Sequence, residues 1–106
     1  MASIAAITAV GSNVAYCAMK AGLVNMTKSL ARALAPDIRV NSISPGLTET
    51  SLIKEWEEYK SEQIRKTPLG RLATCDDIAN AAFALAVSLK YVTGENIVVD
   101  GGRTLV

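Results

Sequence analysis

One long helical pattern lies between two short stretches that are typical of β-strands, and this order limits what the chain can fold into. From Val14 to Ala35, apolar residues recur at the spacing of one helix face, and Pro36 ends the pattern. Residues 1–6 are apolar and predict the end of a strand, while residues 38–43 alternate apolar and polar side chains as a strand does. Strands that alternate with helices of this length predict a parallel sheet of the α/β class with right-handed crossovers.

The rest of the chain adds two helices and one strand to this pattern. Residues 51–66 are charged and amphipathic, residues 78–89 are rich in alanine, and residues 96–100 are mostly apolar. The element order is therefore β-α-β-α-α-β, which we expect to form a single domain over residues 1–106 with two full strands and a stub. The last strand is expected to be covered on both faces, because its apolar residues are continuous.

Local signals set the expected helix ends and faces. Ser12, in the turn before the long helix, is expected to cap it, and Thr74 with Asp77 has the form of a capping box. Glu62 and Lys66 are spaced as a favourable helical pair. The expected stripe of the long helix is Tyr16, Lys20, Leu23, Thr27, Leu30 and Leu34, and the expected inward side chains of residues 51–66 are Leu52, Ile53, Trp56, Tyr59, Gln63 and Ile64.

Composition excludes several classes of function. The 106 residues include 11 Lys and Arg against 10 Asp and Glu, a balance that argues against nucleic acid or an acidic membrane as the main partner. Histidine is absent, so proton chemistry must use tyrosine, lysine, cysteine or carboxylates. The two cysteines lack metal-site spacing, and the apolar start has no basic segment and is too short to span a bilayer. We therefore expect a reduced, cytoplasmic protein.

Tyr16 and Lys20 are the first candidates for chemistry. They lie four residues apart, so their side chains share one face of the predicted helix. An ammonium group near a phenol stabilises the phenolate, and such a tyrosine can give a proton to a carbonyl oxygen or take one from an alcohol. The alternative is ordinary packing with a lysine whose amine reaches solvent. The spacing alone leaves both interpretations open.

Two further segments surround this pair. Ser3 precedes Tyr16 by thirteen residues, at the predicted end of a strand, where its hydroxyl can bind the same substrate oxygen. Pro45 and Gly46 follow the next strand and predict a turn at the carboxyl edge of the sheet, where α/β proteins bind ligands. Thr48 and Thr50 add hydroxyl groups there. A plain connecting turn is the alternative.

The joint pattern resembles the short-chain dehydrogenase/reductase family. Its parts are S-x12-Y-x-x-x-K, RVNSISPGLTET, TPLGRLATCDDIANAAFAL and YVTGENIVVDGG, in this order over nearly the whole chain. PLGR and VDGG make it most similar to the 3-oxoacyl-carrier-protein reductases and the sugar or alcohol dehydrogenases. The resemblance implies the C-terminal half of a Rossmann-like, doubly wound parallel sheet, with the N-terminal half absent.

The resemblance also implies roles for individual residues. Tyr16 would be the catalytic acid and base, Lys20 would hold the nicotinamide ribose and tune Tyr16, and Ser3 would polarise the substrate oxygen. Residues 52–64 would form a substrate lid, although an ordinary solvated helix explains that segment equally well. The residues implied around the nicotinamide of NAD or NADP are Tyr16, Lys20, Pro45, Gly46, Leu47, Thr48 and Thr50.

Two functions remain open at this level. The first is an NAD(P)-dependent oxidoreductase that acts on a small carbonyl or alcohol. The second is a catalytically incompetent remnant that serves as a dimerisation or interaction module, because the 106 residues contain no glycine-rich turn for the cofactor pyrophosphate. In either case we expect a homo-oligomer or association with a related subunit, since the missing sheet half would leave apolar surface exposed.

Overall fold

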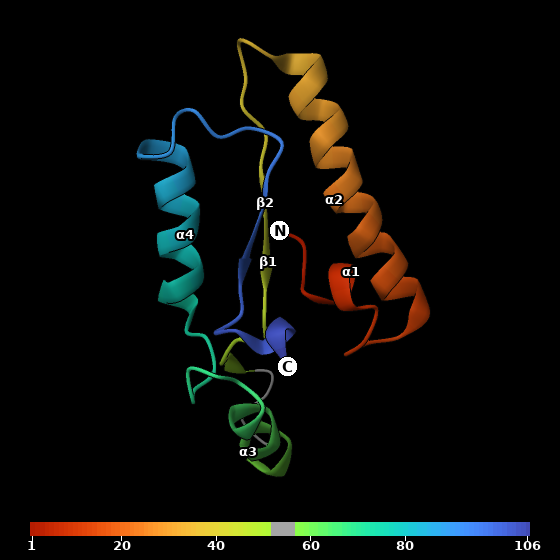
Figure 1. Ribbon diagram of the computed structural model, residues 1–106, viewed down its shortest axis with the longest axis vertical. Coiled ribbons are helices and arrows are strands. Elements are labelled where there is room, and N and C mark those ends of the chain that lie inside the picture. The colour runs from red at the N-terminus through yellow and green to blue at the C-terminus, as the bar shows by residue number, and fades with distance from the viewer. Residues whose placement is uncertain (52–56) are drawn as a thin grey trace.

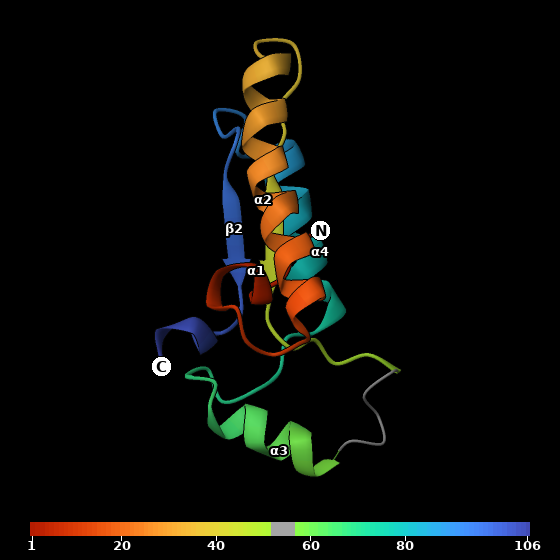
Figure 2. The same cartoon turned by 90° about the vertical axis from the view of Figure 1, so that its right-hand side faces the viewer.

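The computed structural model describes residues 1–51 and 57–106, and places a small parallel sheet between two helices (Figure 1). Figures 1 and 2 together show α2 and α4 on opposite faces of this sheet, with α3 below its lower end. The α/β class is therefore confirmed. The elements are α1 (Ala5–Thr8), α2 (Val14–Leu34), β1 (Ser42–Pro45), α3 (Glu57–Arg65), α4 (Cys75–Val87), β2 (Asn96–Val99) and η2 (Arg103–Leu105).

The strands β1 and β2 are parallel; β2 starts at Asn96 as predicted, whereas β1 starts later than the sequence indicates. Ser42 pairs with Asn96, and the register continues to Pro45 opposite Val99. The strand predicted over residues 38–43 is therefore shifted, and Pro45 belongs to the strand rather than to a turn. Residues before Ser42 do not form part of the strand because they lie beside the loop that precedes β2. The Val40 carbonyl, for example, accepts from the Gly94 N–H of that loop at 2.7 Å.

The N-terminal segment runs beside β1 without forming a regular strand. Ala2 N–H donates to the Ile43 carbonyl at 2.7 Å, and Ile4 N–H donates to the Pro45 carbonyl at 3.0 Å. Pro45 has no N–H to return a bond, so the ladder is one-sided there. Beyond Ile4 the prediction of a strand over residues 1–6 is wrong, since the chain turns into the short helix α1.

The long helix α2 forms where it was predicted, but its cap and its buried face differ. Asn13, not Ser12, is the N-cap, and its side chain accepts from the Tyr16 N–H at 2.8 Å. Leu30 and Leu34 of the predicted stripe are 40% and 38% exposed. The buried residues of α2 are Cys17, Thr27 and Ala31. Within the described ranges, no helix is long and apolar enough to cross a membrane.

The core lies between α4 and the sheet. Ile43 of β1 packs with Ile78 and Leu85 of α4. The predicted capping box is confirmed at the start of α4, where Thr74 and Asp77 bond to each other's backbone. The other face of β2 is less covered than predicted, because Val98 is 40% exposed.

The helix α3 covers the second part of the segment predicted as one helix over residues 51–66. Its buried residue is Lys60, while Tyr59 and Ile64, predicted to face inward, are 40% and 36% exposed. The predicted ion pair between Glu62 and Lys66 is confirmed. Leu52, Ile53 and Trp56 lie outside the described residues.

Candidate active site

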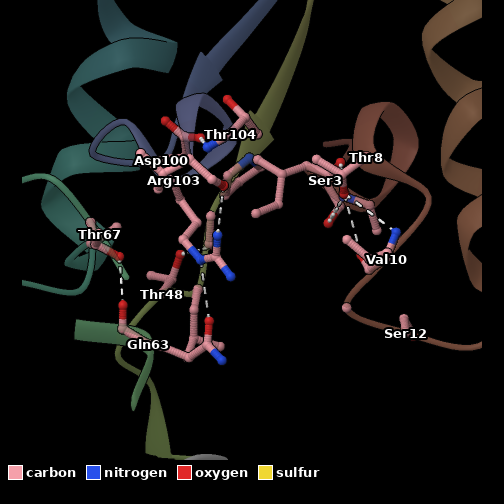
Figure 3. Close-up of a pocket in the computed structure, with 18 of the residues that line it drawn as sticks. Ser3, Thr8, Val10, Ser12, Thr48, Gln63, Thr67, Asp100, Arg103 and Thr104 are labelled. Atoms are coloured by element: carbon pink, nitrogen blue, oxygen red, sulfur yellow. Dashed lines mark hydrogen bonds between the residues drawn. The ribbon is translucent and has the colours of Figure 1, made fainter. Parts of the chain in front are cut away.

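A cavity of about 780 Å³ opens at the carboxyl ends of β1 and β2. Figure 3 shows Ser3 and Thr8 on one side of it and Arg103, Gln63 and Thr67 toward the other. The site residues that the sequence analysis predicted and that line the cavity are Ser3, Tyr16, Pro45, Gly46, Leu47 and Thr48. Parallel strands release their loops at one edge, and this brings residues distant in sequence together.

Tyr16 enters the cavity from the first turn of α2. Its backbone is fixed by the Asn13 cap, and its side chain is half-buried. The Lys20 Nζ lies 5.5 Å from the centroid of the Tyr16 ring, so the predicted pairing of the two side chains is present. Lys20 itself does not line the cavity, and its Nζ donates to the Met1 carbonyl at 3.0 Å.

Ser3 is held between two backbone hydrogen bonds. The N–H groups of its neighbours Ala2 and Ile4 both donate to β1, which fixes the height of Ser3 along that strand. The Ser3 Oγ accepts from the Ala5 N–H at 3.2 Å, at the start of α1. Because this bond uses an oxygen lone pair, the hydroxyl proton remains able to bind an oxygen in the cavity.

The segment that follows β1 forms the floor of the cavity. Gly46 N–H donates to the Val99 carbonyl at 3.0 Å, and a Cβ on Gly46 would lie 3.0 Å from the Asp100 Cα. The sequence therefore needs glycine here for close packing against the end of β2. Thr48 Oγ1 donates to the Gly46 carbonyl at 3.2 Å, while Thr50 does not line the cavity.

The residues after β2 were not predicted as part of the site. Asp100, Arg103 and Thr104 line the cavity together with Gln63 of α3. Burial opposes ionisation of Asp100, but the backbone N–H groups of Thr104 and Gly102 donate to its carboxylate and lower its pKa overall. The signal for these residues was available, because they follow a strand parallel to β1 and so share its edge.

Two charged side chains that line the cavity, Arg71 and Glu62, form ion pairs with neighbouring side chains. Arg71 binds Asp77 through two hydrogen bonds of 2.6 and 3.0 Å, and this bond holds the pKa of Asp77 well below its usual range. The hydrogen bond from Lys66 likewise lowers the pKa of Glu62. In the described ranges, no group of three or more His, Cys, Asp or Glu side chains is arranged to hold a metal ion.

Known proteins match both this sequence and this structure. The model of a family described as Enoyl-(Acyl carrier protein) reductase matches residues 1–104. The NAD-dependent glycerol dehydrogenase of Listeria innocua is 41% identical over 99% of this chain and 43% of its own length. The 3-oxoacyl-[acyl-carrier-protein] reductase FabG of Chlamydia pneumoniae is 41% identical over 98% of this chain and 43% of its own length. The chain belongs to the short-chain dehydrogenase/reductase family.

Solved structures of similar proteins give the same result. A 4-hydroxyisoleucine dehydrogenase complexed with NADH matches with a TM-score of 0.90 and 34% identity, over 99% of this chain and 45% of that one. A small-chain dehydrogenase in complex with NADPH matches with a TM-score of 0.87 and 34% identity, over 99% of this chain and 49% of that one. The chain thus spans less than half the length of these short-chain dehydrogenases, and both forms of the cofactor occur among them.

Proposed function

We propose that the chain carries the acid–base and nicotinamide-binding part of an NAD(P)-dependent oxidoreductase for a small carbonyl or alcohol. The cavity supports this proposal, because it gathers Ser3, Tyr16 and the segment 45–48 at one edge of a parallel sheet. The observation that carries it is the placement of Lys20 Nζ 5.5 Å from the Tyr16 ring, beside a cavity that a small substrate can enter.

The residues present fit the nicotinamide end of the cofactor. Pro45, Gly46, Leu47 and Thr48 offer an apolar and backbone surface at the cavity floor. Lys20 uses one donor on the Met1 carbonyl, and an ammonium has three, so two remain for ribose hydroxyls. When bound, the nicotinamide supplies or accepts the hydride. We place Thr50 at the edge of this site, since it lies two residues beyond Thr48.

The proton step belongs to the chain's own side chains. Tyr16 Oη gives a proton to the carbonyl oxygen in the reduction and takes it back in the oxidation. The positive charge of Lys20 stabilises the phenolate form between these steps. The Ser3 hydroxyl donates to the same substrate oxygen and so holds it within reach of Tyr16.

Replacing Tyr16 by phenylalanine tests this function. We expect Tyr16→Phe to lower the rate of NADH or NADPH oxidation with a carbonyl substrate by about 10²- to 10⁴-fold, the usual contribution of general acid–base catalysis. Folding should not change, because the Tyr16 hydroxyl makes no hydrogen bond within residues 1–51 and 57–106. The matched control is Tyr91→Phe, which removes a hydroxyl from a fully exposed tyrosine outside the cavity. Equal rates for the two variants would refute the role of Tyr16.

The second candidate function is association without catalysis. α2 exposes large apolar side chains, with Val14 at 86%, Met19 at 67% and Met26 at 50% exposure. Exposed apolar surface of this kind favours a partner, either a second copy or a related subunit. Sedimentation over a range of concentrations distinguishes the cases: a monomer at every concentration contradicts an interaction module that pairs with itself.

A further inference from the structure

Arg103 brings a positive charge to the cavity at a position fixed by the backbone. Gly101 and Gly102, with φ of +64° and +86°, turn the chain directly after β2. The Asp100 carboxylate accepts from Gly102 N–H at 2.9 Å and from Thr104 N–H at 2.7 Å. Arg103 N–H donates to the Asp100 carbonyl at 3.2 Å. Bonds on both sides of Arg103 therefore determine where its side chain starts.

The guanidinium group itself is held weakly. Its Nε lies 3.5 Å from Gln63 Oε1, and its Nη1 lies 3.4 Å from a main-chain oxygen of Val106, the last of the 106 residues. Both distances exceed the usual range for an N–H···O bond, about 2.7 to 3.2 Å. Figure 3 shows Arg103 beside Gln63, on the other side of the cavity from Ser3. A ligand can replace such long bonds with shorter ones at little cost.

The acidic side chains near Arg103 are bound by other groups. Arg71, the other cation that lines the cavity, is bound to Asp77, and Glu62 is bound to Lys66. The Asp100 carboxylate is already engaged by backbone N–H groups. Within the described part of the chain, no acidic side chain forms an ion pair with Arg103. Of the two arginines that line the cavity, Arg103 is therefore the one that no Asp or Glu side chain of the described residues pairs with.

We propose that Arg103 determines substrate specificity by binding a carboxylate, so that the substrates are oxo- or hydroxy-carboxylic acids. A guanidinium presents parallel N–H donors that match the two oxygens of a carboxylate. A substrate whose carbonyl oxygen lies at Ser3 and Tyr16 extends across the cavity toward Arg103 and Gln63. This inference rests on the proposed function, which gives the carbonyl end of the substrate its place.

Matched pairs of ligands test the inference. 4-Oxopentanoate and 5-oxohexanoate are each compared with their methyl esters, which keep the ketone and lose the negative charge. Dissociation constants for the 106-residue chain are measured by titration calorimetry with and without NADH, and rates are measured by NADH absorbance. We expect at least one acid to bind about 10- to 100-fold more tightly than its ester, the range for charge-assisted hydrogen bonds.

Three variants separate charge, geometry and location. Arg103→Gln should abolish the preference for the acid and leave the affinity for the ester unchanged. Arg103→Lys, which keeps the charge but not the paired donors, should retain part of the preference. Arg65→Gln removes an exposed arginine of α3 outside the cavity and should change nothing. A preference that persists in Arg103→Gln, or falls equally in Arg65→Gln, would overturn the proposal.

The remaining outcomes are also decisive. Equal binding of acid and ester, or no binding of either acid, by the unsubstituted chain overturns the carboxylate site. If Arg103→Gln instead weakens NADH binding and leaves the ratio of acid to ester unchanged, Arg103 binds a cofactor phosphate and the proposal is wrong. Selective binding of an acid without NADH oxidation would support the carboxylate site and count against the proposed oxidoreductase function alone.

Discussion

Replacing Arg39 by methionine is expected to lower the free energy of unfolding by about 3 kcal/mol. The Arg39 guanidinium donates to four backbone carbonyls, two in the last turn of α4 and two just beyond it. Nη1 reaches those of Leu85, Leu89 and Val92 at 2.9, 3.0 and 3.1 Å, and Nη2 reaches that of Ala86 at 3.1 Å. The last carbonyls of a helix have no partner within the helix, so this one side chain satisfies the end of α4.

The expected loss of about 3 kcal/mol in the free energy of unfolding depends on which of these hydrogen bonds are partly buried. Those to Leu85 and Val92 are partly buried, and each bond from a charged donor contributes about 1.5 kcal/mol or more. Those to Ala86 and Leu89 are exposed, so water replaces Arg39 there at little cost. Two sheltered bonds thus give the expected loss. Methionine keeps much of the apolar stem, so the change isolates the guanidinium.

Urea unfolding followed by circular dichroism measures this loss. Arg39→Lys should lose about half as much, because one ammonium cannot reach carbonyls on several sides at once. Arg32→Met, an exposed arginine at the end of α2, should stay within about 0.5 kcal/mol of the unsubstituted chain. The reasoning is refuted if Arg39→Met and Arg32→Met have the same midpoint and the same slope with denaturant.

Two further predictions concern pH and backbone geometry. The hydrogen bond from Arg71 lowers the pKa of Asp77, so the stability from this pair is present above the ordinary carboxyl pKa of about 4 and is lost as the pH falls. Asp77→Asn should therefore make the urea midpoints at about pH 3 and pH 7 more alike. An unchanged pH dependence of the midpoint would count against the pair. Gly101→Ala should cost at least about 1 to 2 kcal/mol, since φ is +64° and a Cβ would lie 2.8 Å from Thr67 Cγ2. Gly22→Ala, in α2 with open space around it, should instead stabilise the chain by roughly 0.5 to 1 kcal/mol, and equal effects of the two would contradict the geometry.

Local signals in the sequence predicted the end of α2 and the cap of α4. α2 ends before Pro36 as expected, and Thr74 with Asp77 caps α4 as the spacing indicated. These features depend on residues within a few positions of one another, so sequence carries them directly. The N-cap of α2 shows the limit: Ser12 and Asn13 are both good caps, and the backbone angles of Asn13 decide the choice.

Features that depend on distant partners could not be predicted in the same way. The start of β1 at Ser42 depends on where Asn96 of β2 begins, and no local pattern shows this register. Arg39 appeared as one polar residue in an alternating stretch, whereas its partners lie 46 to 53 residues further along the chain. Lys60, charged and in an amphipathic helix, is buried because it binds Glu49 and Glu57 at 3.6 and 3.2 Å.

The same contrast explains why half of the candidate site was accessible from sequence and half was not. Ser3 and Tyr16 were found through spacing along one segment, and the N-terminal bonds to Ile43 and Pro45 now hold Ser3 at the height of the cavity. Arg103 belongs to no such motif, yet it reaches the cavity because β2 is parallel to β1 and ends at the same edge. Local spacing thus places the residues that we propose for proton transfer, while the residue that we propose for specificity depends on sheet topology. We therefore expect a change at Arg103 to alter substrate preference without displacing Tyr16.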